Sequence, residues 1–94
     1  MSFMIYCLDK PDHEAVRAGN RDAHVDYLKG FANQVIIAGP LLREDGGGMI
    51  GSLLLMAFAS RAEAEAFVAG DPYGKAGLFE SVTITPWKKV LPQG

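Results

Sequence analysis

The chain changes repeatedly between two hydrophobic patterns, and each change marks the end of a predicted element. Four segments are short apolar or alternating runs, a pattern that favours β-strands. They are Phe3–Leu8, Val35–Leu42, Ile50–Ala59 and Ser81–Trp87. The polar, glycine-rich segment Glu44–Gly48 separates the second run from the third and predicts a hairpin loop. Within the second run, Gly39–Pro40 indicates a bend or a sheet edge.

Two other segments place apolar residues three and four positions apart, as an amphipathic helix does. The first helix is expected to begin loosely at Asp12, to be interrupted near Gly19–Asn20, and to be well defined over Arg21–Ala32. The second helix follows Ser60, which has the spacing of a capping box with the glutamate three residues later, and it runs to about Ala69. The glycine that comes next is a typical stop signal.

The resulting order is strand, helix, strand, strand, helix, strand, without a repeat or a linker. This order is typical of a ferredoxin-like α+β sandwich, and we expect residues 1–94 to form a single domain of this kind. In that topology the first and third strands are central, the second and fourth are edges, and the helices cover one face of the sheet.

The two central strands are apolar on both of their faces. In Phe3–Leu8 and in Leu53–Phe58, both sets of alternate positions are hydrophobic. Because the helices cover only one face of the sheet, the other face also requires burial. At about 25 cal/mol per Å2 of apolar area, a bare face of this kind is a strong association surface. We therefore expect a homodimer that packs sheet against sheet, with the functional site near that interface.

His24 is the most informative candidate for chemistry, because it lies in a helical stripe that should face the interior. The stripe consists of Arg21, His24, Tyr27, Leu28 and Phe31. Asp71, just past the second predicted helix, is the expected partner, since a carboxylate fixes the tautomer of a histidine and stabilises its charged form. Each residue also has a structural interpretation. His24 can be a buried hydrogen-bonding residue, and Asp71 before Pro72 can accept backbone N–H groups in a turn.

Two further side chains are candidates for holding a substrate. Arg21 lies one turn before His24 on the same side of the helix and can bind an anionic group through two parallel hydrogen bonds. Tyr73 can donate its hydroxyl to a substrate oxygen, or it can cap the core. Arg17 lies one turn further back and is a second candidate for binding an anionic group, but we expect it to be a solvated charge at the start of the helix.

Composition and charge exclude several classes of partner. The 94 residues are 49% hydrophobic with a net charge of -2, which indicates a globular chain without the basic stripe that nucleic acid requires. No apolar run reaches the roughly 18 residues of a membrane span, and the first residues lack the features of a signal peptide. Cys7 is the single cysteine, expected to be an inert core thiol in a reducing cytoplasm. With so few candidate ligands, we expect no metal ion and no cofactor.

Several motifs, in order along the chain, resemble the YciI-like (YCII-related) family. They are Arg21-x-x-His24, Ala38-Gly39-Pro40-Leu41, Asp71-Pro72-Tyr73, Ala76-Gly77-Leu78-Phe79 and Pro86-Trp87. The similarity covers nearly the whole chain. It departs mildly before His24, where Asn20-Arg21-Asp22-Ala23 replaces the Thr-Arg-Pro often seen in the family.

The resemblance implies a ferredoxin-like fold that dimerises as an α+β barrel. It also implies a cleft with a His–Asp pair, which is His24 and Asp71 in this sequence. A dehydrochlorinase that acts on a chlorinated hydroxyquinone belongs to the family, and muconolactone isomerases share the broader architecture.

These observations predict a small cofactor-independent lyase or isomerase in which His24 moves a proton and Asp71 orients it. The substrate is expected to be a small cyclic or unsaturated compound, with Arg21 and Tyr73 around the oxygen on which charge develops. A non-catalytic module that binds a small metabolite in the same cleft is the alternative. A purely structural dimerisation domain is a third possibility, and it would leave the pair as buried scaffolding.

Overall fold

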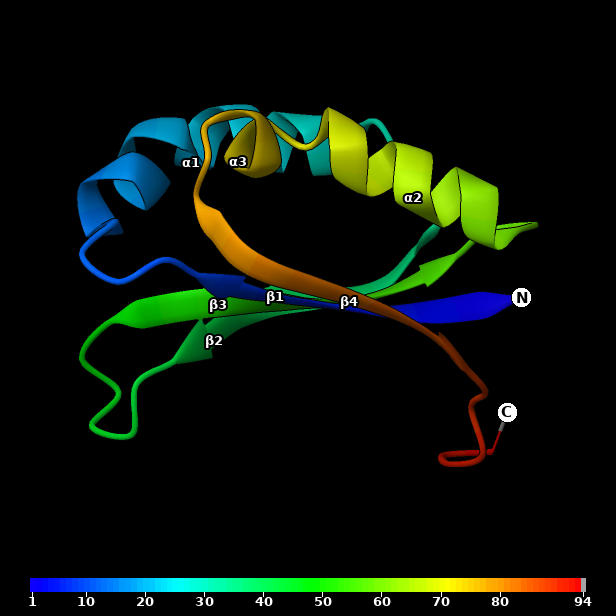
Figure 1. Ribbon diagram of the computed structural model, residues 1–94. Helices are drawn as coiled ribbons and strands as arrows, with labels where there is room; N and C mark the ends of the chain where they lie inside the picture. Colours follow the sequence, from blue (N-terminus) through cyan, green and yellow to red (C-terminus); the bar gives the residue numbers. More distant parts are fainter. Residues whose placement is uncertain (94) are drawn as a thin grey trace.

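The computed structural model describes residues 1–93 and shows an antiparallel sheet with the helices on one of its faces (Figure 1). In chain order the elements are β1 (Ser2–Asp9), α1 (Glu14–Lys29), β2 (Val35–Leu42), β3 (Met49–Ala57), α2 (Arg61–Gly70), α3 (Pro72–Lys75) and β4 (Phe79–Trp87). The strands lie in the order β2-β3-β1-β4. The predicted ferredoxin-like α+β fold is therefore confirmed, with β1 and β3 at the centre. The expected domain extends to Gly94, which lies outside the described residues.

Helix α1 is continuous, so the interruption expected near Gly19–Asn20 is wrong. Asn20 donates from Nδ2 to the carbonyl of Val16 at 2.9 Å, a bond that runs along the helix and does not break it. Arg17 and His24, on either side of this point, are both buried. Their packing outweighs the weak local preference of glycine and asparagine against a helix.

The helix ends also differ from the sequence expectation. Helix α1 ends at Lys29, earlier than the expected end near Ala32. The short helix α3 was not expected. Asp71 is its N-cap and accepts the backbone N–H of Tyr73 at 3.0 Å, and Pro72 occupies the first turn, where its missing N–H costs nothing. None of the helices in the described part of the chain is long and apolar enough to cross a membrane.

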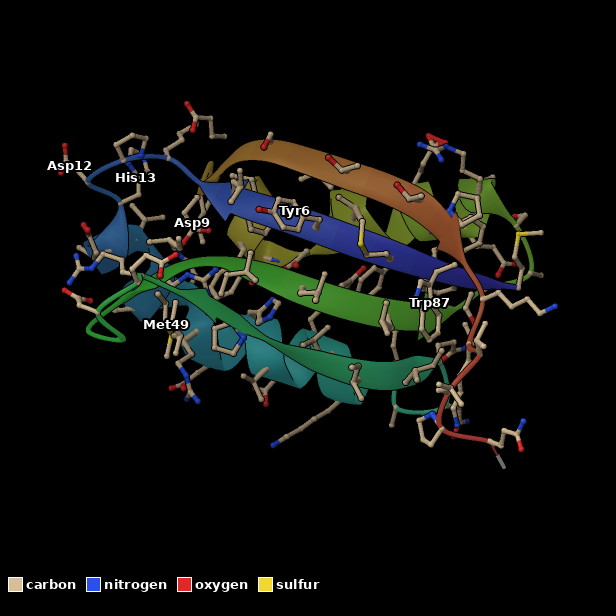
Figure 2. The ribbon with its side chains drawn as sticks, turned by 90° about the horizontal axis from the view of Figure 1, so that it is seen from below. Tyr6, Asp9, Asp12, His13, Met49 and Trp87 are labelled. Carbon is tan, nitrogen blue, oxygen red and sulfur yellow. The ribbon has the colours of Figure 1, made fainter. Side chains whose placement is uncertain are left out.

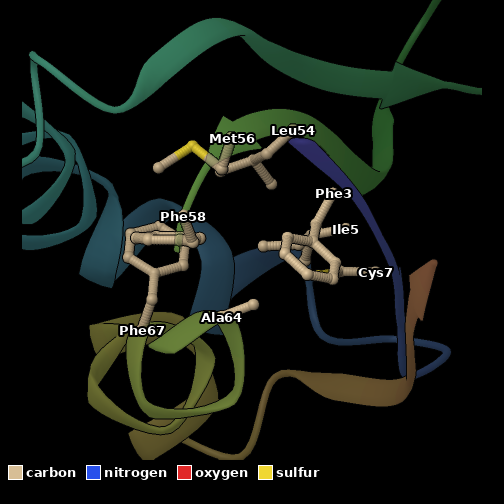
Figure 3. Close-up of a cluster of buried hydrophobic side chains, with 8 residues drawn as sticks. All are labelled: Phe3, Ile5, Cys7, Leu54, Met56, Phe58, Ala64 and Phe67. Atoms are coloured by element: carbon tan, nitrogen blue, oxygen red, sulfur yellow. The ribbon is translucent and has the colours of Figure 1, made fainter. Parts of the chain in front are cut away.

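The core lies between the helices and the central strands. Phe3 pairs with Met56 and Ile5 pairs with Leu54 across β1 and β3, so their side chains share the face beneath the helices. The cluster on this face is completed from α2 and from the segment before it (Figure 3). Its members are Phe3, Ile5, Cys7, Leu54, Met56, Phe58, Ala64 and Phe67.

The opposite face of the sheet is apolar over β1 and β3 but has no helix on it. Tyr6 pairs with Leu53 and Met4 pairs with Leu55, and all four side chains are only half-buried. Figure 2 looks onto this face and shows Tyr6 near its middle. Strand β4 contributes polar side chains at its edge, such as Thr83 opposite Tyr6. We call this surface the open face.

Candidate functional site

His24 and Asp71 meet beneath α1. The Nδ1 atom of His24 lies 2.8 Å from Oδ1 of Asp71, and the two residues are 8% and 4% exposed. Because a carboxylate only accepts hydrogen bonds, Nδ1 carries the proton in this pair. The Nε2 atom has no partner among residues 1–93, and His24 lines a pocket. The arrangement leaves Nε2 as the atom that can take a proton.

The same carboxylate oxygen has two functions. Oδ1 of Asp71 accepts from His24 and also from the backbone N–H of Tyr73, which starts α3. The turn interpretation and the histidine-partner interpretation of Asp71 therefore hold together. The helix cap fixes the carboxylate, and the carboxylate fixes the imidazole ring.

The close approach of α1 to the end of α2 places Asp71 under His24. Tyr27 on α1 donates its hydroxyl to the carbonyl of Phe67 at 2.8 Å. At Gly70, a Cβ atom would collide with that hydroxyl, so only glycine permits this contact. The start of α2 has the predicted capping box, in which Ser60 Oγ accepts from the N–H of Glu63 at 3.3 Å.

Tyr73 lies between the histidine and an arginine. Its ring stacks on the imidazole of His24 with centroids 3.9 Å apart and an interplanar angle of 15°. The guanidinium carbon of Arg17 lies 4.7 Å from the centroid of the same ring. Burial raises the pKa of the Tyr73 phenol above its usual range, although the charges of Arg17 and Arg21 oppose the shift. The phenol therefore stays neutral at physiological pH and remains an O–H donor.

Arg17 is the clearest departure from the sequence expectation, because it is 7% exposed and not a solvated charge. Its Nε and Nη2 atoms donate to the two carboxylate oxygens of Asp9 at 2.6 and 3.0 Å, and Nη2 also donates to Ser52 Oγ at 3.0 Å. Burial opposes the charge, but the hydrogen bonds and charge of Asp9 outweigh it and raise the pKa of Arg17. The expectation failed because Arg17 faces the end of β1, where Asp9 supplies a partner.

Asp9 and Ser52 also belong to this site, although neither was expected there from the sequence. A signal was present, since Ser52 is a polar residue at an inward position of the most apolar strand, and a buried polar side chain is more informative than an exposed apolar one. Asp9 ends β1 and reads as an ordinary turn residue. Its pairing with Arg17 depends on the distance between β1 and α1, which the sequence does not show.

The pocket at this site lies between α1 and the strands β2 and β3 and has a volume of about 230 Å3. Its walls include apolar residues such as Leu28 and Pro40. Its polar lining consists of Arg17, Arg21, His24, Ser52 and Tyr73. Arg21 is exposed, and it has no hydrogen bond or ion pair within residues 1–93. Since a cavity of ~150 Å3 already holds benzene, a ligand with one substituted ring fits this space.

Two further possibilities for chemistry are the Cys7 thiol and a cluster of metal ligands. Burial, together with the charges of Asp71 and Asp9, raises the pKa of the Cys7 thiol to about 12. Cys7 is therefore protonated and unreactive at neutral pH, as expected from the sequence. Within the described residues, no group of three His, Cys, Asp or Glu side chains converges as it would around a metal ion.

Comparison with known protein sequences gives a consistent family assignment. The model of the YCII-related domain family matches residues 1–88. Protein YciI of Escherichia coli O6:H1 is 34% identical over 98 residues, which cover 97% of this chain and 100% of that protein. An uncharacterised protein of Haemophilus influenzae is 31% identical with the same coverage.

Comparison with solved structures extends the similarity to the fold. A 5-chloro-2-hydroxyhydroquinone dehydrochlorinase from Burkholderia phenoliruptrix AC1100, in complex with 2,5-dihydroxybenzoquinone, is 38% identical with a TM-score of 0.87 over 94% of each chain. A candidate antibiotic biosynthesis monooxygenase from Nitrosomonas europaea has a TM-score of 0.55 at 18% identity, over 99% of this chain and 92% of that one. The second similarity concerns the fold alone.

Proposed function

The chain belongs to the YCII-related domain family, and we propose that it is a small, cofactor-independent lyase or isomerase in which His24 accepts a proton. The geometry of His24 carries this proposal. Its Nδ1 is held by buried Asp71 at 2.8 Å, while its Nε2 has no partner within residues 1–93 and the residue lines the pocket. A histidine held in this way acts as a general base, because the carboxylate stabilises the imidazolium that forms.

In the proposed reaction, Nε2 of His24 takes the proton of a substrate hydroxyl. The electron pair of that O–H bond forms a carbonyl, and the adjacent π pair takes the proton back from Nε2 at a ring carbon, which completes an isomerase reaction. In a lyase reaction, that ring carbon carries the leaving group and becomes tetrahedral. Nε2 then takes the proton of a second hydroxyl, the electron pair of this O–H bond forms a second carbonyl, and the next π pair shifts and expels a leaving group such as chloride with its bonding electrons. Both routes are balanced without an oxidant or a cofactor.

The charge that develops on the substrate oxygen needs donors nearby. Tyr73 is a neutral phenol in the pocket wall, and Arg21 is an exposed cation at the same pocket. We propose that both hold this oxygen, since donors aimed at a developing charge lower the barrier to its formation.

A hydroxylated six-membered ring is the substrate class that the pocket suits. The volume of about 230 Å3 admits one substituted ring. The dehydrochlorinase that is 38% identical to this chain binds 2,5-dihydroxybenzoquinone, which supports a ring with several oxygens. We therefore propose that the substrate is a hydroxylated ring that carries either a leaving group or a double bond able to migrate.

Turnover of halogenated hydroquinones tests the proposal, with chloride release and quinone absorbance as the two measurements. His24→Ala is expected to lower kcat by about 100- to 10,000-fold, the usual contribution of a general base. His13→Ala is the matched control, because this histidine bonds the carbonyl of Pro11 outside the pocket. Normal turnover by His24→Ala contradicts the mechanism. A ligand that binds the native chain and is recovered unchanged supports the alternative, a metabolite-binding module.

We also propose that the chain acts as one cytoplasmic domain that forms a homodimer, an α+β barrel, through the open face. The half-buried apolar side chains of β1 and β3 on that face support this arrangement. Leu55→Glu at its centre is expected to produce a monomer in analytical ultracentrifugation. Ala62→Glu on the exposed side of α2 is the control and should remain dimeric. A native chain that sediments as a monomer contradicts the proposal.

A further inference from the structure

We propose that Ser52 is a further substrate-binding residue, whose hydroxyl donates to the substrate oxygen that becomes negative. Arg17 is the positioning residue that holds Ser52 in this orientation. The inference rests on the proposed function, because it assigns a role at the same pocket. It adds a fixed donor on the sheet to the side chains already placed on the helices.

The donor role of Ser52 follows from the chemistry of its partner. Nη2 of Arg17 lies 3.0 Å from Ser52 Oγ, and a guanidinium group can only donate. Ser52 Oγ is therefore the acceptor in this bond, and its own hydrogen must point elsewhere. No residue within 1–93 accepts that hydrogen, although Ser52 is only 4% exposed. Because Ser52 lines the pocket, a ligand in the pocket is the remaining acceptor.

The orientation of this hydroxyl is fixed before a ligand arrives. Asp9 holds Arg17 through two hydrogen bonds of 2.6 and 3.0 Å, and Ser52 lies in the central strand β3, paired with Cys7 of β1. If the hydroxyl turned toward Arg17, two donors would face each other. A preorganised donor stabilises a developing charge without the cost of reorienting during the reaction. The nearby cation also polarises the O–H bond and strengthens its interaction with an anion.

The position of Ser52 restricts the chemistry of the ligand. His24 comes from α1 and Ser52 from the sheet, and both line the same pocket. One ring can therefore present a hydroxyl to the imidazole and a second oxygen to the serine. The substrate class is accordingly a ring with at least two oxygens, joined by conjugation so that charge from one reaches the other. A ring without the second oxygen leaves the donor of Ser52 unpaired and should bind more weakly.

Equilibrium binding of hydroquinone, compared with phenol, which lacks the second oxygen, tests this inference independently of turnover. Ser52→Ala is expected to raise the Kd of the dihydroxy ligand about tenfold, the usual effect of losing one donor. Ser52→Thr retains the hydroxyl and should bind nearly as the native chain does. Ser81→Ala, on the exposed edge strand, is the matched control and should not change Kd.

The decisive quantity is the coupling between Ser52 and the second ligand oxygen, that is, how much the effect of removing this oxygen on Kd changes when the serine hydroxyl is also removed. Removing that oxygen should weaken binding to the native chain but have little effect on binding to Ser52→Ala, because the interaction is already lost. Arg17→Lys keeps a positive charge but cannot donate to both Asp9 and Ser52 as a planar fork does, so this coupling should disappear. A general loss of stability would weaken the binding of both ligands equally. A change confined to the ligand with the second oxygen therefore assigns Arg17 to positioning Ser52 and not to a structural role.

The outcomes separate this inference from the proposed function. If Ser52→Ala loses as much affinity as the native chain when the second ligand oxygen is removed, the role of Ser52 is wrong and the His24 mechanism is unaffected. If Arg17→Lys loses as much affinity as the native chain, the positioning role of Arg17 is wrong. If neither hydroquinone nor phenol binds the native chain, both the ring-substrate proposal and this inference are wrong. If His24→Ala binds the ligands normally but turns over no slower than the native chain, only the His24 mechanism is wrong.

Discussion

Two buried pairs of an acid and a base lie along the same side of α1, and they differ in what they leave available. Arg17 and Asp9 satisfy each other through two hydrogen bonds, so this pair is a permanent pair of charges. His24 and Asp71 share one hydrogen bond, and the second ring nitrogen has no partner within residues 1–93. The first pair holds the Arg17 guanidinium in place beside the pocket. The second pair is the one that we propose to move a proton.

Burial alone does not distinguish the two pairs. The four residues are buried or nearly so, and each base meets a carboxylate within 3.0 Å. The difference lies in the base itself. A guanidinium keeps its charge at any physiological pH, whereas an imidazole changes charge in this range.

Removing one member of the Arg17–Asp9 pair is expected to have the largest effect, a loss of stability. Arg17→Met leaves the Asp9 carboxylate buried without its cation and should lower the free energy of unfolding by about 3–5 kcal/mol. Arg17→Met combined with Asp9→Leu replaces both charges with apolar groups and should recover most of that loss. Urea denaturation of the two variants gives the comparison. Equal stability of the single and double variants would show that Asp9 is not stranded.

Changing His24 and Asp71, the pair proposed to move the proton, should affect chemistry more than stability. Asp71→Asn preserves the cap on α3, since asparagine is as good an N-cap as aspartate, and should cost about 1 kcal/mol or less in stability. It removes the charge that stabilises the imidazolium, so kcat should fall by at least about 100-fold. Steady-state kinetics and thermal melting separate the two effects. A large loss of stability with normal turnover would assign the pair to scaffolding.

The Cys7 thiol lies close enough to both pairs to be affected by their carboxylates. Burial is the main reason that its pKa is raised, and the charges of Asp71 and Asp9 raise it further. The folded thiol keeps its proton up to about pH 12, whereas the unfolded thiol loses it near pH 9.0. Unfolding therefore becomes more favourable as the pH rises between these values. The free energy of unfolding should decline by about 1 kcal/mol per pH unit in this window.

Cys7→Ala isolates this contribution, since tyrosines also titrate in the alkaline range. The difference in slope between the native chain and Cys7→Ala, measured by urea denaturation from pH 8 upward, belongs to the thiol. Equal slopes would contradict the raised pKa. At pH 8 the folded thiol should also resist alkylation, because little thiolate is present.

The smallest expected effect is at Arg21, which lies one turn from each buried base but is itself exposed. Arg21→Ala should raise KM by about tenfold or less and leave the melting temperature unchanged, because an exposed charge adds little to stability. Lys29→Ala, further along α1 and outside the pocket, is the matched control. A fall in kcat without a change in KM would assign Arg21 to the transition state and not to binding.

The fold was predictable because its pattern is local. Apolar runs and caps located the four strands and the two longer helices. His24 could be singled out because it interrupts an apolar stripe. Its partner Asp71 could be suggested because it ends the helix that lies over the same sheet.

The second pair was not predictable in the same way. Arg17 and Ser52 are far apart in sequence, and a guanidinium near a helix start is usually solvated. Only the packing of α1 against β1 and β3 brings Arg17 to both Asp9 and Ser52. The continuity of α1 was missed for the same reason, since it depends on long-range packing that outweighs the local preference of Gly19 and Asn20.

The double use of one oxygen atom in Asp71 has a consequence for how such chains diverge. Oδ1 both caps α3 and holds the histidine, so selection for folding and selection for the proposed activity act on the same atom. A descendant that abandons that activity still needs a cap, which aspartate or asparagine can supply, while its histidine is free to drift. When chains of this kind are sorted by activity, a capping residue at position 71 marks the architecture, and the histidine opposite it is the residue to examine.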